Sequence, residues 1–179
     1  MECMPGKESR IDDEKGDNMD TVEPGTGLTP REKNALRDTW AVVMQDKRKN
    51  GFLFFKKFFE MFPKMQGYFK FRDVELNDLE ENATFKLHAG KVFTQINNMV
   101  ENLDNVPELV GIIKGVGSDH APNGITAEAF ENLRDAFLAF LVERMSATIT
   151  PFQKTSWEKV MGVIVALAQD GFNSAKGTQ

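Results

Sequence analysis

Apolar residues recur at alternating intervals of three and four over residues 83–103, the spacing that places side chains on one face of an α-helix. His88 lies on that face, three residues after Phe85. A second helical pattern runs over residues 107–120 and ends with His120 on its apolar face. A histidine on such a face is a buried, hydrogen-bonded residue more often than a metal ligand, so the spacing alone leaves both interpretations open.

The rest of the hydrophobic pattern is also helical. Thr29 and Glu32 form a capping box that begins a helix, and the basic stretch 47–50 is expected to close it. The next helix, predicted over 51–63, carries five phenylalanines within eight residues, so it must be enclosed on most sides or line a cavity. Residues 63–82 are predicted as an aromatic connection with a short helical turn, and further helices begin at Thr126 and Thr150. No segment alternates as a strand does, so the sequence predicts an all-α fold.

Charge is concentrated at the start of the chain. Residues 1–28 contain eight acidic and three basic side chains, a net charge of −5 that equals the net charge of all 179 residues. The remainder is therefore neutral overall, which argues against nucleic-acid binding. Residues 1–27 have no aromatic residue and are predicted to be a disordered acidic extension, followed by one domain over 28–173 and a C-terminal tail over 174–179.

The same composition bears on location and partners. No apolar run reaches the roughly 20 residues that a transmembrane helix needs. The first residues have no secretory pattern, and the only cysteine is Cys3, so we expect a cytoplasmic protein without an intramolecular disulfide. The acidic extension either improves solubility or, with Cys3, binds a partner or is modified.

From Leu28 to about Phe172 the chain resembles the globin family, and it is most similar to arthropod globins and cytoglobins. The similarity is carried by Trp40, by Pro63 with Phe69 six residues later, and by the motifs LHAGKV at 87–92 and GSDHAPNGI at 117–125. Each motif alone is weak. Their order and spacing, in a chain with only two histidines, make the resemblance specific.

The resemblance implies a globin fold of about eight helices around a pocket for haem b (iron protoporphyrin IX). It implies that His120 is the proximal ligand of iron and that His88 is the distal histidine. Gly51 is expected to face Ala89 and Gly90 where two helices cross. The resemblance also implies that the cofactor contacts Phe55, Phe69, Phe71, Phe85, Val92, Val116, Ile125 and Phe130. Arg72 and Lys91 are candidates to pair with the haem propionates, although an ordinary solvated role is equally open to them.

Similarity to this family implies reversible binding of dioxygen and other diatomic gases, for oxygen storage or transport, rather than enzymatic catalysis. In cytoglobin-like members the distal histidine can itself bind iron when no gas is present. Two alternatives stay open. One is a haem redox enzyme, a nitric-oxide dioxygenase, nitrite reductase or peroxidase, served by a partner reductase. The other is a redox or gas sensor that acts through the acidic extension. A homodimer is also left open.

Overall fold

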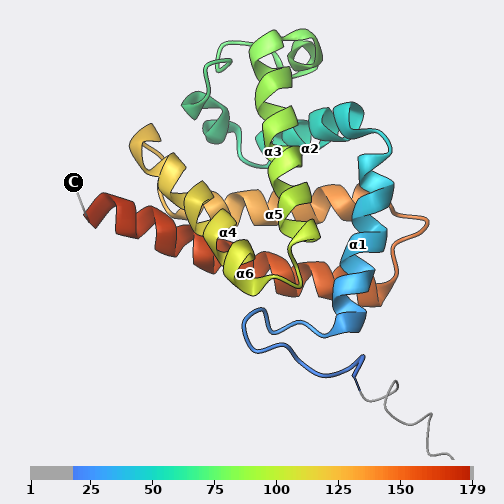
Figure 1. The fold of residues 1–179 in the computed structure, drawn as a ribbon. Helices are drawn as coiled ribbons and strands as arrows, with labels where there is room; N and C mark the ends of the chain where they lie inside the picture. Colours follow the sequence, from blue (N-terminus) through green and yellow to red (C-terminus); the bar gives the residue numbers. More distant parts are fainter. Residues whose placement is uncertain (1–17, 178–179) are drawn as a thin grey trace, which may run out of the picture.

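The computed structural model describes residues 18–177, and within them all regular secondary structure is helical, which confirms the all-α prediction (Figure 1). No helix in this range is both long enough and apolar enough to cross a bilayer. The helices follow one another in the order α1 (Pro30–Met44), α2 (Lys47–Met61), η1 (Pro63–Tyr68), η2 (Leu76–Glu81), α3 (Ala83–Glu101), α4 (Val106–His120), η3 (Ala121–Asn123), α5 (Glu128–Arg144) and α6 (Pro151–Gly177), the η elements being 3₁₀ helices.

Most helix starts agree with the sequence signals, but α5 begins at Glu128 rather than at Thr126, and the boundary between α1 and α2 differs. Thr29 and Glu32 form the predicted capping box, and Thr150 with Gln153 forms another at the start of α6. The expectation that residues 47–50 close the first helix is wrong. That helix ends at Met44, and the carboxylate of Asp46 accepts a hydrogen bond from the backbone N–H of Lys49 at 3.2 Å, which begins α2 instead.

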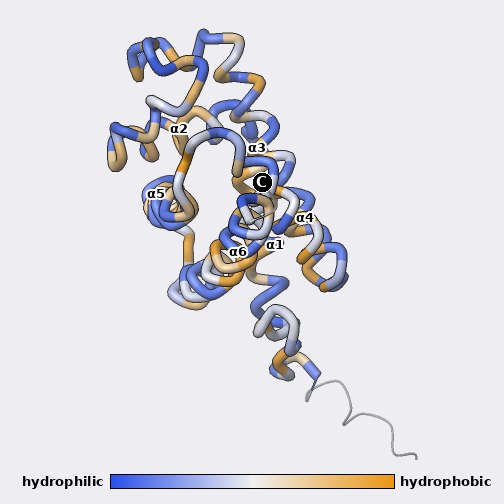
Figure 2. The backbone as a smooth tube through the Cα atoms, turned by 90° about the vertical axis from the view of Figure 1, so that its left-hand side faces the viewer, coloured by the Kyte–Doolittle hydropathy of each residue, from blue (hydrophilic) through white to orange (hydrophobic). Residues whose placement is uncertain are grey.

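Helix α6 is the base of the fold, because it contacts α1, α4 and α5, while α2 contacts α3 and α5 (Figures 1 and 2). In both views α4 runs alongside α6. Aromatic side chains fill the space between these layers. Trp40, Phe93 and Trp157, for example, are each no more than 2% exposed, and Trp40 lies 5.4 Å from Phe93 between ring centroids. This core fixes α3 and α4, which carry the two histidines.

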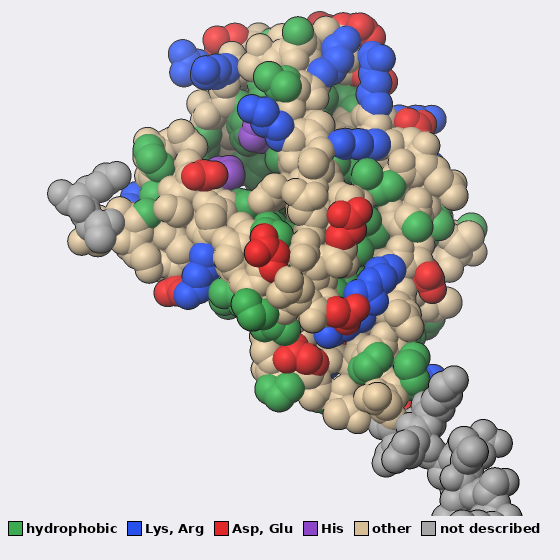
Figure 3. Space-filling view, in the orientation of Figure 1, with side chains coloured by type: hydrophobic (Ala, Val, Ile, Leu, Met, Phe, Trp, Pro, Cys, Tyr) green, Lys and Arg blue, Asp and Glu red, His purple; other side chains and the backbone are tan. Residues whose placement is uncertain are grey.

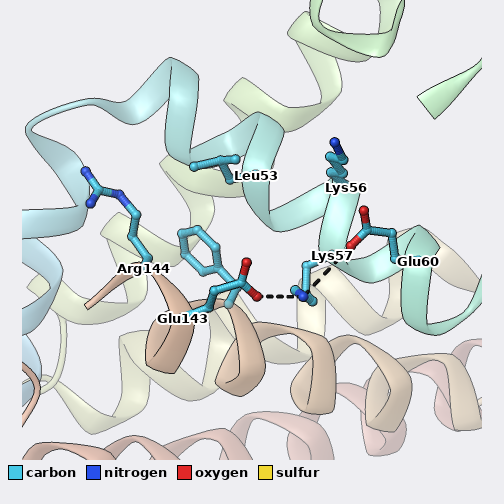
Figure 4. A pocket seen from close by; sticks show the side chains of 7 residues that line it. Leu53, Lys56, Lys57, Glu60, Glu143 and Arg144 are labelled. Carbon is cyan, nitrogen blue, oxygen red and sulfur yellow. Dashed lines mark ion pairs between the residues drawn. The ribbon is translucent and has the colours of Figure 1, made fainter. Parts of the chain in front are cut away.

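A cleft of about 370 Å³ separates α2 from α5 on the outer surface (Figure 4). Lys57 lies across it and forms ion pairs with Glu143 at 2.6 Å and Glu60 at 3.8 Å. Arg144 donates a hydrogen bond to the buried amide oxygen of Asn50 at 2.8 Å. Because these charged and polar groups mainly bind one another, they connect α2 to α5 across the cleft.

The two ends of the chain differ in part from the predicted boundaries. Residues 18–27, which we expected to be disordered, form a turn in which the Glu23 carboxylate accepts hydrogen bonds from the backbone N–H groups of Gly25 and Thr26. Leu28 then enters the core. At the other end α6 continues to Gly177, past the predicted domain end at residue 173. The prediction of disorder for residues 1–17 lies outside the described residues, as do Cys3 and residues 178–179.

The closest approach between helices is that of α4 and α6. A Cβ atom added to Gly117 would collide with the backbone carbonyl of Ala168, and one added to Gly171 would collide with that of Lys114. Gly51, by contrast, would place a Cβ atom 3.5 Å from that of Ala89, which is ordinary contact. The crossing that requires glycine is therefore the one that supports His120, three residues after Gly117.

The Gly117→Ala variant is expected to lower the free energy of unfolding by about 1–3 kcal/mol, because the added methyl group must push α4 away from α6. Gly111→Ala is the matched control, since nothing lies within 4 Å of its added Cβ atom and alanine favours a helix by about 1 kcal/mol. Urea denaturation of the three proteins measures both effects. Equal midpoints for the Gly117→Ala variant and the wild type would show that the crossing can relax.

Candidate functional site

His88 is enclosed by aromatic side chains from three elements. Its ring centroid lies 5.4 Å from that of Phe55 on α2, and 5.1 Å and 6.3 Å from those of Phe69 and Phe71 in the connection before η2. Phe85, one turn earlier on α3, contacts both Phe55 at 5.7 Å and Phe71 at 5.4 Å. The sequence prediction placed these four phenylalanines at one site, and the structure brings them together around His88.

This environment keeps His88 uncharged. The pKa of His88 is lowered to about 4, mainly by burial, and the charges that His120 and Lys91 can carry contribute in the same direction. At neutral pH the imidazole is therefore neutral, with one nitrogen that carries a proton and one that carries a free lone pair. Both hydrogen-bond donation and metal ligation remain available to it.

His120 is the last residue of α4, and a backbone carbonyl determines which of its ring nitrogens donates a hydrogen bond. Nδ1 lies 2.7 Å from the carbonyl oxygen of Val116, and because a carbonyl oxygen only accepts hydrogen bonds, Nδ1 must be the donor. The lone pair of the neutral imidazole is then on Nε2. Such a hydrogen bond on the second nitrogen is the usual support of a metal-binding histidine.

The two histidines open into one hollow. Figure 3 shows both imidazoles, the only two in the chain, side by side in a depression of the surface. Val92 lies one turn after His88 and Val116 one turn before His120, and both remain half-exposed although they belong to apolar faces. These apolar walls are incompletely covered, as expected for a pocket that receives a further group.

The donor set indicates what kind of group fits. Within residues 18–177 no three histidine, cysteine, aspartate or glutamate side chains gather where they could hold a bare metal ion. Two imidazoles suit a metal that brings its own in-plane ligands and needs only axial ones. The fold and the site therefore define a helical protein with a pocket for a planar metal cofactor.

Comparison of the sequence with known proteins identifies the family of this chain. The sequence profile of the globin family matches residues 53–167. Cytoglobin-2 of Danio rerio is 31% identical over 160 residues, which cover 88% of either chain, and a globin of Nerita albicilla is 28% identical over 138 residues, which cover 76% of this chain and 88% of its own. The chain belongs to the globin family, and this membership implies a haem cofactor.

Solved structures agree on the fold. A hexacoordinated haem protein from an anhydrobiotic tardigrade superposes with a TM-score of 0.79 at 23% identity, over 84% of this chain and 99% of its own. A globin of Drosophila melanogaster superposes with a TM-score of 0.73 at 24% identity, over 79% of this chain and 93% of its own.

The remaining predicted site residues divide into two groups. Ile125 and Phe130 are buried near His120, and the ring centroids of Phe130 and His120 are 6.0 Å apart. Lys91 is exposed and close enough to His88 for its charge to act there. Arg72 is exposed, and its Nε lies 3.7 Å from the carboxylate of the adjacent Asp73, so it has a local ion-pair partner.

One glycine has a role that sequence reasoning missed, and another does not make the contact that was expected of it. Gly117 fixes the position of α4 under His120, and a signal was present, because it is a glycine inside a predicted helix one turn before that histidine. Gly90 was expected at the contact with Gly51, together with Ala89. Ala89 does face Gly51, but a Cβ atom on Gly90 would meet nothing within 4 Å, so that part of the expectation is wrong.

The pKa of His88 makes the stability of the haem-free protein depend on pH. In the unfolded chain His88 has its ordinary pKa of 6.5, against about 4 in the fold, so between these values the unfolded state binds the additional proton. Stability should therefore fall as the pH is lowered through this range, by about 2 kcal/mol between pH 7 and pH 5.

Urea denaturation of the haem-free protein at pH 7 and pH 5 measures this loss. The His88→Leu variant should lose less stability than the wild type by that amount, since it has no group at this position to protonate. If the two proteins lose the same stability, His88 is not held in its neutral form by the fold.

Proposed function

We propose that this globin holds haem b between His120 and His88 and reversibly binds dioxygen and other diatomic gases, for storage or transport. The observation that carries the proposal is the pairing of two imidazoles with different surroundings. Nδ1 of His120 is committed to a backbone carbonyl, while His88 is confined among phenylalanines. Haem, when bound, supplies an iron atom that takes up a gas molecule in its ferrous state.

On the proximal side, His120 would hold the iron through Nε2. The hydrogen bond from Nδ1 to Val116 fixes the tautomer and the orientation of the ring, and it raises the basicity of the ligating nitrogen. Phe130 lies edge-on to the ring of His120 at 73° and limits its rotation. Ile125, buried just after the turn that follows α4, closes this side with another apolar group.

On the distal side, His88 would act on the gas. A neutral imidazole N–H donates a hydrogen bond, which is worth about 1.5–3 kcal/mol when the acceptor carries charge. Phe55 and Phe69 surround this donor and keep water away from it, which strengthens the interaction and slows oxidation of the cofactor. The phenylalanine at position 55 also narrows the space beside His88, which favours small diatomic ligands.

His88 has a second role in this proposal, as an internal ligand. Because it is neutral and lies in the same hollow as His120, its lone pair would be available to the iron whenever no gas is present. External gases would then compete with His88, and the observed affinity would be reduced by the fraction of molecules in which His88 is bound.

Visible spectroscopy of the reduced, gas-free protein tests this second role. The wild type should give the sharply split low-spin bands of two axial imidazoles, and the His88→Leu variant should give a broad five-coordinate band. A broad band already in the wild type would restrict His88 to hydrogen bonding.

The stability of the oxygenated protein in air separates oxygen carriage from the redox alternative. A stable oxygenated form would favour oxygen carriage, and rapid oxidation would favour the redox alternative.

The His120→Ala variant tests the cofactor assignment itself. Loss of the proximal imidazole should weaken retention of haem by at least tenfold, measured as faster transfer of haemin to an excess of a haem-scavenging protein. The Asp119→Ala variant, changed at the exposed neighbouring residue, is the control and should retain haem as the wild type does. Equal retention in all three proteins would contradict ligation by His120.

A further inference from the structure

A second hollow, the basic groove, lies between the first turns of α2 and α3 and has a volume of about 330 Å³. Its floor is lined by Phe52, Phe85, Ala89 and Gly90, and its rim by Lys47, Arg48, Glu80 and Lys86. In Figure 3 several lysine and arginine side chains gather around the upper end of α3, where this groove lies. The volume is at the lower end of the range for small-molecule sites.

The charge at the groove is unusual for the start of a helix. Helix α2 has no acidic residue in its first turn, where the helix dipole favours anions, and instead begins with three consecutive cations at positions 47–49. Within residues 18–177, the guanidinium of Arg48 makes neither a hydrogen bond nor an ion pair. Lys86 lies 3.4 Å from the Glu81 carboxylate, and Glu80 is the one acid at the groove itself. The rim is therefore positive and keeps an uncompensated guanidinium.

The floor of the groove is kept open by Gly90. A glycine inside a helix costs about 1 kcal/mol relative to alanine, and no neighbouring atom requires it here, because an added Cβ atom would meet nothing within 4 Å. The absent side chain leaves Phe52, which is half-exposed, accessible from the groove. An apolar floor thus lies directly beside a cationic rim.

We propose that the basic groove binds a single-chain amphiphilic anion, a hydrocarbon chain that ends in a carboxylate. The carboxylate would pair with Arg48 and Lys86, since a guanidinium can bind it through two parallel hydrogen bonds. The chain would lie on Phe52 and along the open backbone at Gly90. This proposal does not depend on the one made for the haem pocket, because the groove is lined by neither histidine and shares only Phe85 with the surroundings of His88.

Isothermal titration calorimetry of the haem-loaded protein with monomeric dodecanoate tests the proposal. The wild type should bind one molecule saturably, and Gly90→Leu should weaken binding at least tenfold by filling the groove without a clash. Gly111→Leu is the matched control, because it adds the same side chain at another open helical glycine, and it should bind as the wild type does. The visible spectra of both variants should match that of the wild type, which shows that the haem pocket is intact.

Charge is tested separately. The Arg48→Glu, Lys86→Glu double variant should lose at least tenfold in affinity for dodecanoate, and dodecyltrimethylammonium should not bind the wild type. Unchanged dodecanoate binding in Gly90→Leu would overturn the proposal, as would binding of the cationic amphiphile with equal affinity. Binding to anionic phospholipid vesicles without binding to monomeric dodecanoate would also overturn it, in favour of a membrane surface.

Discussion

The close approach of α4 to α6 is the constraint on which the rest of the structure depends. Gly117 and Gly171 allow the two backbones to meet without intervening side chains. Helix α4 is thereby held firmly along its length, and its last residue, His120, is fixed relative to α6 and to Phe130 on α5. A ligand that must meet a metal at a bonding distance needs a rigid support of this kind.

His88 is held in position in a different way. Where backbone contact positions α4, a cluster of rings positions His88, with contributions from α2, from the connection after η1 and from α3 itself. Stacked and edge-on rings fill this region without offering a hydrogen-bond partner, so the imidazole is desolvated and stays neutral. The same rings that complete the core therefore determine the chemistry of the site.

Much of this arrangement can be predicted from the sequence, because it rests on local patterns. Helical periodicity and the capping boxes at Thr29 and Thr150 are local and give the fold class, and the resemblance of the two histidine motifs to those of globins gives both candidate ligands. The boundary between α1 and α2 is less accessible, because the cations at 47–49 suit the end of one helix as well as the stretch before the next. The hydrogen bond that the Asp46 carboxylate accepts from the backbone N–H of Lys49 shows that these cations belong to the start of α2.

Contacts between distant parts of the chain lie beyond such patterns. Gly117 and Gly171 are 54 residues apart in the sequence, and the residues around either glycine give no sign that the two helices pack together there. The direction in which Gly90 points depends on the exact rotation of α3 about its axis, which periodicity gives only approximately. Residues 18–27 likewise have no helical pattern of apolar side chains that would predict order, and they gain it from hydrogen bonds to Glu23.

The carbonyl of Val116 has a consequence for how such a protein can change over time. It belongs to the main chain, so exchanging the side chain at this position leaves the acceptor in place, and the electronic character of His120 is shielded from most mutations. The surroundings of His88 consist entirely of exchangeable side chains. In the proposed function, substitutions around His88 would therefore change gas preference, while the support of the metal ligand His120 would be inherited nearly unaltered.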